Sequence, residues 1–461
     1  MSATQRDQLD PLVWKITAVA VLGSLLAQLD ATVVNVSLSG LAQDLHATLP
    51  AIQWVTSGYL LALTLVLPLN GWLIDRIGGK ALYLWCFSSF TLSSLLCGLA
   101  WSADALIGFR LLQGASGGLL APMAQLMMKR AAGNQFTRVA GYATVPILLG
   151  PLLGPVIAGV ILHHASWRWL FLVNLPVGVL ALVLSVLFLP DDREALRPAE
   201  LDWLGLVLLS PGLALILFGA ERIRQHVGIV AMVTGVVLLV VFLRVEVRKA
   251  GRALIDLSQF RNRTFAVAAV VQFLSNGVMF AGLMLIPLFL IQACGRSPAA
   301  MGWLLAPLGL GMMVAFPLLG FLTGRFGGRA VATGGALLSL AATLMLVWLA
   351  SRPLQPATFV PALFVRGAGL GATALPAMSA AYASVEQCNL PMSNTTLNIL
   401  QRLGGPTLTT LCALVLAELL GAHPTLVGLN AWEATFLLLA MLHAVMAVTA
   451  MRLPGRMSGR G

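Results

Sequence analysis

The sequence predicts an all-α polytopic membrane protein with two six-helix bundles and an inserted pair of helices. Three observations lead there. Hydrophobic residues make up 59% of the 461 residues and charged residues only 10%, whereas a soluble protein of this size needs a far more charged surface. Lysines and arginines gather in short clusters between long apolar runs, and one segment of the first half recurs in the second.

A membrane-spanning helix needs about 20 apolar residues, and the chain offers fourteen such stretches. The predicted spans are 13–38, 50–74, 81–101, 104–128, 138–163, 168–189, 202–220, 226–243, 265–292, 299–322, 330–350, 357–384, 396–420 and 432–452. We expect an N-terminal six-helix bundle (1–190), an inserted transmembrane hairpin with cytoplasmic linkers (191–263) and a C-terminal six-helix bundle (264–461).

The basic residues predict the orientation. With the N-terminus inside, the inner segments hold 20 lysines and arginines and the outer loops hold five, which is the bias of cytoplasmic loops. Both termini are therefore expected in the cytoplasm. Because the +11 charge is distributed as membrane topology requires, we expect no nucleic-acid partner. The five cysteines are scattered and form no CxxC pair, so no metal site or disulfide framework is expected.

Two segments of the first half recur in the second. GWLIDRIGGKALYL (71–84) and GFLTGRFGGRAVAT (320–333) share six of fourteen positions at a separation of 249 residues, and QGASGGLLAP (113–122) resembles RGAGLGATALP (366–376). Parallel halves of this kind are typical of transporters with a substrate site between the halves, at the middle of the membrane.

Asp30 lies in the apolar run AQLDATVVNV, with no basic residue within ten positions. Arg110 lies inside the fourth predicted span, and both residues are about 9–12 Å from the outer end of their helix. The matching depths predict that Arg110 is the partner of Asp30. Burial favours the neutral acid and a nearby arginine favours the charged form. An acid on which burial and an arginine act in opposite directions can gain and lose a proton. We therefore predict that the pair serves proton coupling.

The stretch GWLIDRIGGK predicts a conformational latch at the cytoplasmic end. Asp75 can reach Arg76, Lys80 or, on the next inner loop, Arg130. Such a charge cluster can hold one conformation. The alternative is an ordinary turn with a helix cap. The second copy has Gly324 in place of Asp75, so a latch based on an acid is confined to the first half.

The fifth predicted span contains PILLGPLLGPVIAGV (146–160), with three prolines and three glycines. Proline removes a helix hydrogen bond and glycine lets a neighbouring helix approach closely. We predict a kinked, tightly packed helix at a rocking interface, with a role in packing alone as the alternative. Its candidate residues are Gly150, Pro151, Gly154, Pro155 and Gly159.

Several polar residues inside the spans are candidates for a substrate cavity, with hydrogen bonding between helices as the alternative. They are Gln28, Thr32, Asn35, Gln113, Asn276, Arg366 and Asn398. The chain has no G-x-x-x-x-G-K-[ST] motif, so it does not hydrolyse ATP by a P-loop. We expect no enzyme activity and no cofactor, and we expect a proton gradient to supply the energy.

Taken together, these motifs resemble the major facilitator superfamily, in particular its fourteen-helix drug:proton antiporter branch of the EmrB/QacA type. LDATVVNV, GWLIDRIGGK, FRLLQG and GPLLGPVIAG carry the resemblance, and the stretch 113–178 looks closest to MdtD-like exporters. Ser37-Leu38-Ser39 and Ala158-Gly159 depart mildly from the pattern of the branch. The resemblance implies proton-coupled export by alternating access across the bacterial inner membrane, with Asp30 and Arg110 in proton coupling and Asp75 in the latch.

The substrate stays open at this point. Asp30 is the only deep acid, against three arginines within spans: Arg110, Arg366 and Arg402. A neutral or anionic substrate is therefore as consistent with the sequence as a cationic drug. The alternatives are an exporter of drugs or amphipathic compounds, an exporter of a metabolite or metal chelate such as a citrate complex, and a transporter-like sensor or scaffold. The expected partners are a small-molecule substrate, protons and membrane lipid, and the sequence does not indicate an oligomeric state.

Overall fold

The computed structural model describes residues 10–191, 200–223, 225–249, 255, 257–296, 298–421 and 430–455. This part of the chain is helical and contains no strand, which confirms the all-α prediction. Eleven helices are long and apolar enough to cross a membrane, and the bent pair α3–α4 makes a twelfth. The remaining long helices, α6 and α7, have 30 and 29 residues, enough at about 1.5 Å per residue to cross about 30 Å of hydrocarbon. The count of fourteen and the orientation stay predictions.

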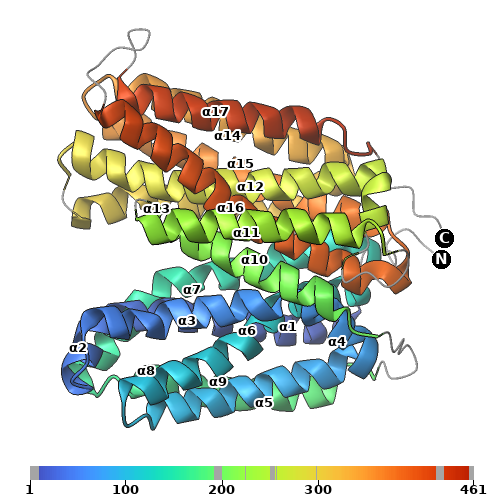
Figure 1. Cartoon of the computed structure of the whole chain (residues 1–461). Helices are drawn as coiled ribbons and strands as arrows, with labels where there is room; N and C mark the ends of the chain where they lie inside the picture. The colour runs from blue at the N-terminus through green and yellow to red at the C-terminus, as the bar shows by residue number, and fades with distance from the viewer. Residues whose placement is uncertain are drawn as a thin grey trace. The chain divides into compact units, whose positions relative to one another are not determined.

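Contacts divide the chain into two compact units, and unit 1 comprises Met1–Leu215, Thr234–Asp256 and Cys388–Thr395. Its first helices, drawn from blue to teal in Figure 1, are α1 (Pro11–Val33), α2 (Leu38–Asp44), α3 (Leu49–Val66), α4 (Leu69–Ile77), α5 (Gly79–Gly98), α6 (Ala103–Ala132), α7 (Phe136–His164), α8 (Trp169–Leu172) and α9 (Asn174–Phe188). Within the unit, α6 packs against α1, α3 and α5, while α9 packs against α1 and α5.

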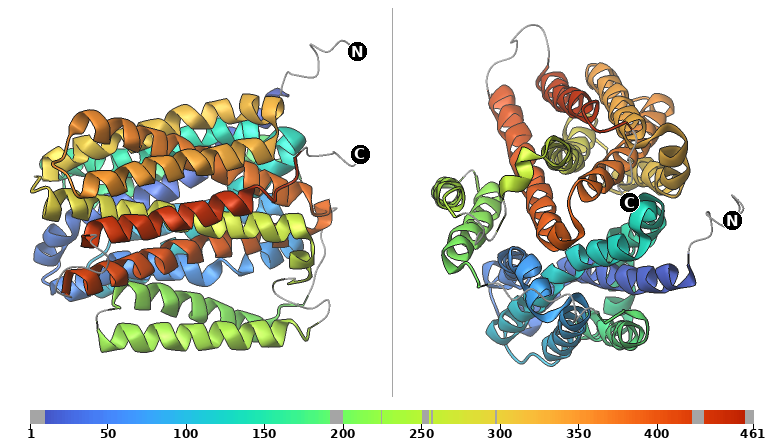
Figure 2. Two further views of the ribbon diagram at one scale, coloured as in Figure 1. Left: turned by 90° about the horizontal axis from the view of Figure 1, so that it is seen from above. Right: turned by 90° about the vertical axis from the view of Figure 1, so that its right-hand side faces the viewer.

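Unit 2 comprises Ile216–Val233, Leu257–Gln387 and Thr396–Gly461. Its helices are α12 (Arg263–Leu288), α13 (Pro298–Phe326), α14 (Gly328–Ala350), α15 (Pro356–Ala383), α16 (Leu390–Gly421, whose first residues belong to unit 1) and α17 (Ala431–Ala450). Helix α15 packs against α12, α13 and α14, and α17 packs against α12 and α14. This pairing matches that of α6 and α9 in unit 1, as the sequence repeat leads one to expect. Inside each unit the long helices run side by side, and the right-hand view of Figure 2 looks nearly along their axes.

The predicted inserted hairpin forms two helices, α10 (Trp203–Glu221) and α11 (His226–Glu246). The limits of the two units run through these helices, because residues 216–233 cluster with unit 2 and the flanking parts with unit 1. At the cytoplasmic end predicted from sequence, Lys249 Nζ donates to Asp202 Oδ1 over 2.5 Å, and the buried Glu246 accepts from the backbone N–H of Ile255. These bonds tie the ends of the hairpin together.

The repeated segment has the same backbone turn in both units. Gly78 has φ +86° and Gly327 has φ +84°, and α5 and α14 each begin at the next residue. An L-residue is strained at such an angle, whereas glycine adopts it freely. The glycine pair at 78–79 and its copy at 327–328 therefore encode the same reversal.

Two predicted spans are interrupted. The predicted span 50–74 consists of α3 and α4, which are bent by 59° relative to each other. Pro68 lies between them and lacks the backbone N–H that a continuous helix would need. The predicted span 13–38 changes at Val34–Ser37 from α-helix to a 3₁₀ turn. The sequence did not predict these two interruptions, because hydropathy reports apolar length and not helix continuity.

Candidate functional site

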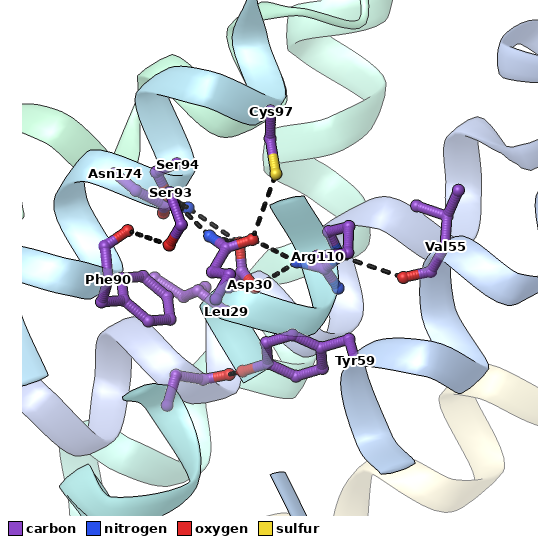
Figure 3. A network of polar contacts seen from close by, with 12 residues as sticks. Leu29, Asp30, Val55, Tyr59, Phe90, Ser93, Ser94, Cys97, Arg110 and Asn174 are labelled. Carbon is purple, nitrogen blue, oxygen red and sulfur yellow. Dashed lines mark hydrogen bonds and ion pairs between the residues drawn. The ribbon is translucent and has the colours of Figure 1, made fainter. Parts of the chain in front are cut away.

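Asp30 and Arg110 form an ion pair inside unit 1. Arg110 Nη1 donates to Asp30 Oδ2 over 2.5 Å, and both side chains are 0% exposed. Arg110 Nε donates to the carbonyl oxygen of Val55 over 3.0 Å, and the guanidinium lies 4.1 Å from the centroid of the Tyr59 ring. The structure thus brings together the two residues whose depths matched in the sequence (Figure 3).

The second carboxylate oxygen of Asp30 accepts from two side-chain amides. Gln113 Nε2 donates to Asp30 Oδ1 over 3.0 Å, and Asn174 Nδ2 donates to the same atom over 2.9 Å. Both amides also donate to Ser94 Oγ, over 2.6 Å and 3.2 Å. The residues come from α1, α5, α6 and α9 and surround the carboxylate closely (Figure 3). We call Asp30, Arg110, Gln113, Asn174 and Ser94 the Asp30 cage.

The cage fits the charged form of Asp30. A carboxylate only accepts hydrogen bonds, and here it accepts three from Arg110, Gln113 and Asn174. A proton on either oxygen would face a donor and displace it, so the cage must rearrange when Asp30 becomes neutral. Because the donors stand on two helices, α6 and α9, a proton at this position alters the contacts of those helices with α1.

Two cage residues were not predicted from the sequence. Asn174 lies in the motif SWRWLFLVNLPVG and Ser94 in the apolar α5. A lone amide within an apolar helix was the available signal for Asn174; a serine gives no such signal, because its hydroxyl is commonly satisfied by its own helix. Gln113 was predicted for the substrate cavity but instead belongs to the cage. It lies one helical turn after Arg110, and residues three apart share a face.

Helix α7 contains the proline- and glycine-rich stretch of the fifth predicted span. It packs against α1 through two of its glycines. A Cβ at Gly150 would lie 3.3 Å from Cβ of Gln28, and one at Gly154 would collide with Thr32 Oγ1. Gly159, in contrast, has no neighbouring atom within 4 Å. The side chains of Pro151, Pro155 and Asn35 lie outside the described part of the structure.

The predicted latch residues are spread along the ends of α4, α5 and α6. The guanidinium of Arg76 lies 5.4 Å from the ring of Trp72 on its own helix, and Lys80 Nζ donates to the carbonyl oxygen of Val186 over 3.2 Å. Asp75 is half-buried and Arg130 is exposed. The latch role of these residues stays a prediction.

A second set of contacts surrounds Gly71 in the same motif. A Cβ at Gly71 would lie 3.3 Å from the Cα of Met392, so the absence of a side chain lets the backbone of 388–395 come close. Asn394 Nδ2 donates to the carbonyl oxygen of Pro122 over 2.8 Å, and Asn70 Nδ2 lies 3.5 Å from Thr395 Oγ1. The beginning of α16 is thereby held to α4 and α6 within unit 1.

The remaining cavity candidates have different surroundings. Gln28 is exposed, while the Thr32 hydroxyl donates back to the carbonyl oxygens of its own helix. In unit 2, a Cβ added at Gly405 would lie 3.2 Å from Asn276 Oδ1, so Asn276 lies against α16. Asn398 is buried. Arg366 is fully buried.

Comparison with known proteins decides the family. The model of the Major Facilitator Superfamily matches residues 20–406 and 268–459. The chain belongs to the major facilitator superfamily. It is 35% identical over 419 residues to the multidrug resistance protein B homolog of Mycobacterium tuberculosis H37Rv, covering 89% of this chain and 77% of that protein.

A second relative is the putative multidrug resistance protein MdtD of Escherichia coli K12. It is 32% identical over 335 residues, which cover 70% of this chain and 69% of that protein. Among solved structures, the human organic anion transporter MFSD10 (TETRAN) matches 96% of this chain and all of its own chain, with a TM-score of 0.67 and 19% identity. That likeness shows the fold alone. The major facilitator resemblance and the all-α fold are confirmed, and the chain is a multi-span membrane transporter for small molecules.

Proposed function

We propose that the protein exports drugs or other small amphipathic compounds across the bacterial cytoplasmic membrane in exchange for protons, by alternating access. The observation that carries this proposal is the Asp30 cage. An intramembrane acid is expensive to maintain and is a functional candidate by default. Here Asp30 has one cationic partner, Arg110, and two amide donors whose hydrogen bonds to the carboxylate can break. The relatives named as multidrug resistance proteins support the substrate class.

In this mechanism Asp30 exchanges a proton as unit 1 changes conformation. A proton from the outside neutralises Asp30 and weakens its bond to Arg110. Release of the proton to the inside restores the pair. Inward movement of one proton down 100 mV provides about 2.3 kcal/mol, enough for about a 50-fold substrate gradient. No cofactor takes part in this scheme.

Substrate-induced proton release from the purified full-length protein tests the proposal. The wild type is compared with Asp30→Asn, and the control is Asp104→Asn, an exposed acid at the outer end of α6. The compounds are ethidium as a cation, chloramphenicol as a neutral compound and a metal–citrate complex as an anion. We expect release from the wild type and the control, and none from Asp30→Asn. Equal release from all three proteins would place coupling elsewhere.

A second candidate function is export of a metabolite or a metal chelate such as a citrate complex. The observation that favours it is Arg366, a fully buried cation in unit 2. The same experiment separates the two candidates, because the compound that releases protons reveals its charge class. A sensor or scaffold predicts no release with any compound.

A further inference from the structure

Arg366 differs from Arg110 in lacking a carboxylate partner. Its side chain is fully buried, and Nη2 donates to the carbonyl oxygen of Val278 over 2.8 Å. Nε and Nη1 have no hydrogen-bond partner among the described residues. Unpaired buried donors are costly, and an unpaired buried charge more so. The described part of the chain therefore leaves two nitrogens of the group open to a ligand.

No internal counter-ion for Arg366 stands on α15 or on the three helices that contact it, and Glu418 of α16, which packs against α12, is exposed. Helices α12, α13 and α14 contact α15, and none of these four contains an aspartate or glutamate. Helix α17, which packs against α12 and α14, contains one acid, Glu433. Its carboxylate accepts from the backbone N–H of Asn430 and closes the capping box at the start of that helix, ten residues before His443.

His443 provides a second unsatisfied polar group. It is fully buried on α17, within the electrostatic reach of Arg366. Its Nδ1 lies 2.8 Å from the carbonyl oxygen of Leu439, and Nε2 has no partner among the described residues. Unpartnered buried polar atoms thus lie on two helices of unit 2, α15 and α17.

Gly282 makes the space that the guanidinium occupies. A Cβ at this position would lie 2.7 Å from Arg366 Nη1 and 2.6 Å from Cζ. Any larger residue would push the guanidinium away from α12. The glycine therefore sets the position of the charge as well as allowing close packing.

We propose that Arg366 is a binding site for a small carboxylate anion inside unit 2. The carboxylate supplies the missing counter-charge and accepts from the free guanidinium nitrogens. The site is enclosed in this conformation, so the anion enters when the transporter opens; this deepens the proposed transport function and rests on it. The Asp30 cage lies in unit 1 and handles the proton, so the two sites are separate.

Calorimetric titration of the purified full-length protein tests the site. Acetate and citrate are the carboxylate probes and chloride is the inorganic anion, with HEPES as the buffer. We expect a carboxylate to bind the wild type, and Arg366→Gln to weaken binding at least tenfold. Arg352→Gln is the matched control, because this arginine is exposed and stacks on Trp348 instead.

Gly282→Ala keeps the charge and displaces the guanidinium, so it is the second test if Arg366→Gln fails to fold. It should also weaken carboxylate binding at least tenfold. Ethidium-induced proton release, measured on the same Arg366→Gln protein, reports the proposed function separately from the anion site. Binding of chloride but no carboxylate, equal binding in wild type and Gly282→Ala, or no binding of any probe by wild type would each overturn the proposal.

Discussion

At the scale of the residue, the two buried arginines have opposite surroundings. Arg110 has a carboxylate, an amide oxygen, a backbone carbonyl and an aromatic face around it, whereas Arg366 has one backbone carbonyl. Both were visible in the sequence as charges within apolar spans. Only the first has an acid at matching depth, and this is why the sequence predicted one pair and placed the other arginine among the candidates for a substrate cavity.

Breaking the ion pair between Asp30 and Arg110 should strongly destabilise unit 1. Replacing Arg110 by glutamine leaves the carboxylate of Asp30 buried without its cation, which we expect to cost about 3–5 kcal/mol. The double variant Asp30→Asn/Arg110→Gln should recover most of that loss, because no charge is left unpaired. Thermal unfolding in detergent measures both. A double variant no more stable than Arg110→Gln would show that the cage does not depend on the charge of Asp30.

Asn174 should stabilise the Asp30 cage. Asn174→Ala removes one donor from the Asp30 carboxylate, and a hydrogen bond to a charged group contributes about 1.5–3 kcal/mol. We therefore expect the variant to unfold more readily and to transport more slowly than the wild type. Thermal unfolding in detergent and proton-driven uptake into inverted vesicles measure the two effects. Ser185→Ala on the same helix, whose hydroxyl donates to the carbonyl oxygen of Ala181, should leave transport at the wild-type rate.

At the scale of the element, α7 and α1 pack through glycine. The proline- and glycine-rich motif predicted close packing, and Gly150 and Gly154 do lie against α1. The sequence did not distinguish these glycines from Gly159, because all three follow the same spacing pattern. The orientation of α7 about its own axis decides which of them touches a neighbour.

Gly154→Ala should therefore impair transport more than Gly159→Ala. The new methyl group at 154 collides with Thr32, while the one at 159 meets no atom within 4 Å. We expect at least a tenfold loss of transport in proteoliposomes for Gly154→Ala, and near wild-type rates for Gly159→Ala. Adding Thr32→Ala to Gly154→Ala removes the colliding hydroxyl and should restore part of the rate. Equal losses at 154 and 159 would contradict a packing role that is specific to α1.

At the scale of the whole molecule, two units repeat one helix-pairing pattern. Helices α6 and α15 hold corresponding positions, and the turn at Gly78 recurs at Gly327 with nearly the same φ. The units are not chemically equivalent. The first places an acid and an arginine in contact, and the second places an arginine among helices without acids. A duplicated fold has thus acquired different charges in its two copies.

The predicted orientation has a direct test. Asn134→Cys lies on a predicted inner loop and Trp101→Cys at the outer end of the predicted span 81–101, both at exposed positions. In a background without the five native cysteines, a membrane-impermeant maleimide added to intact cells should label Trp101→Cys only. Inverted vesicles should reverse the result. Labelling of Asn134→Cys in intact cells would contradict the N-in, C-in arrangement.

The sequence by itself determined the membrane class, the repeated halves, the family and the pairing of Asp30 with Arg110. Composition, charge distribution and depth along a helix can be read from the chain alone. They are informative because a membrane restricts where apolar and charged residues can lie. Only the tertiary structure decided that Gln113 joins Asn174 and Ser94 around Asp30, that Gly154 touches α1, and that Arg366 lies without a counter-ion. These features depend on which helix faces meet, and helix rotation follows from packing across the whole unit, which local spacing does not specify.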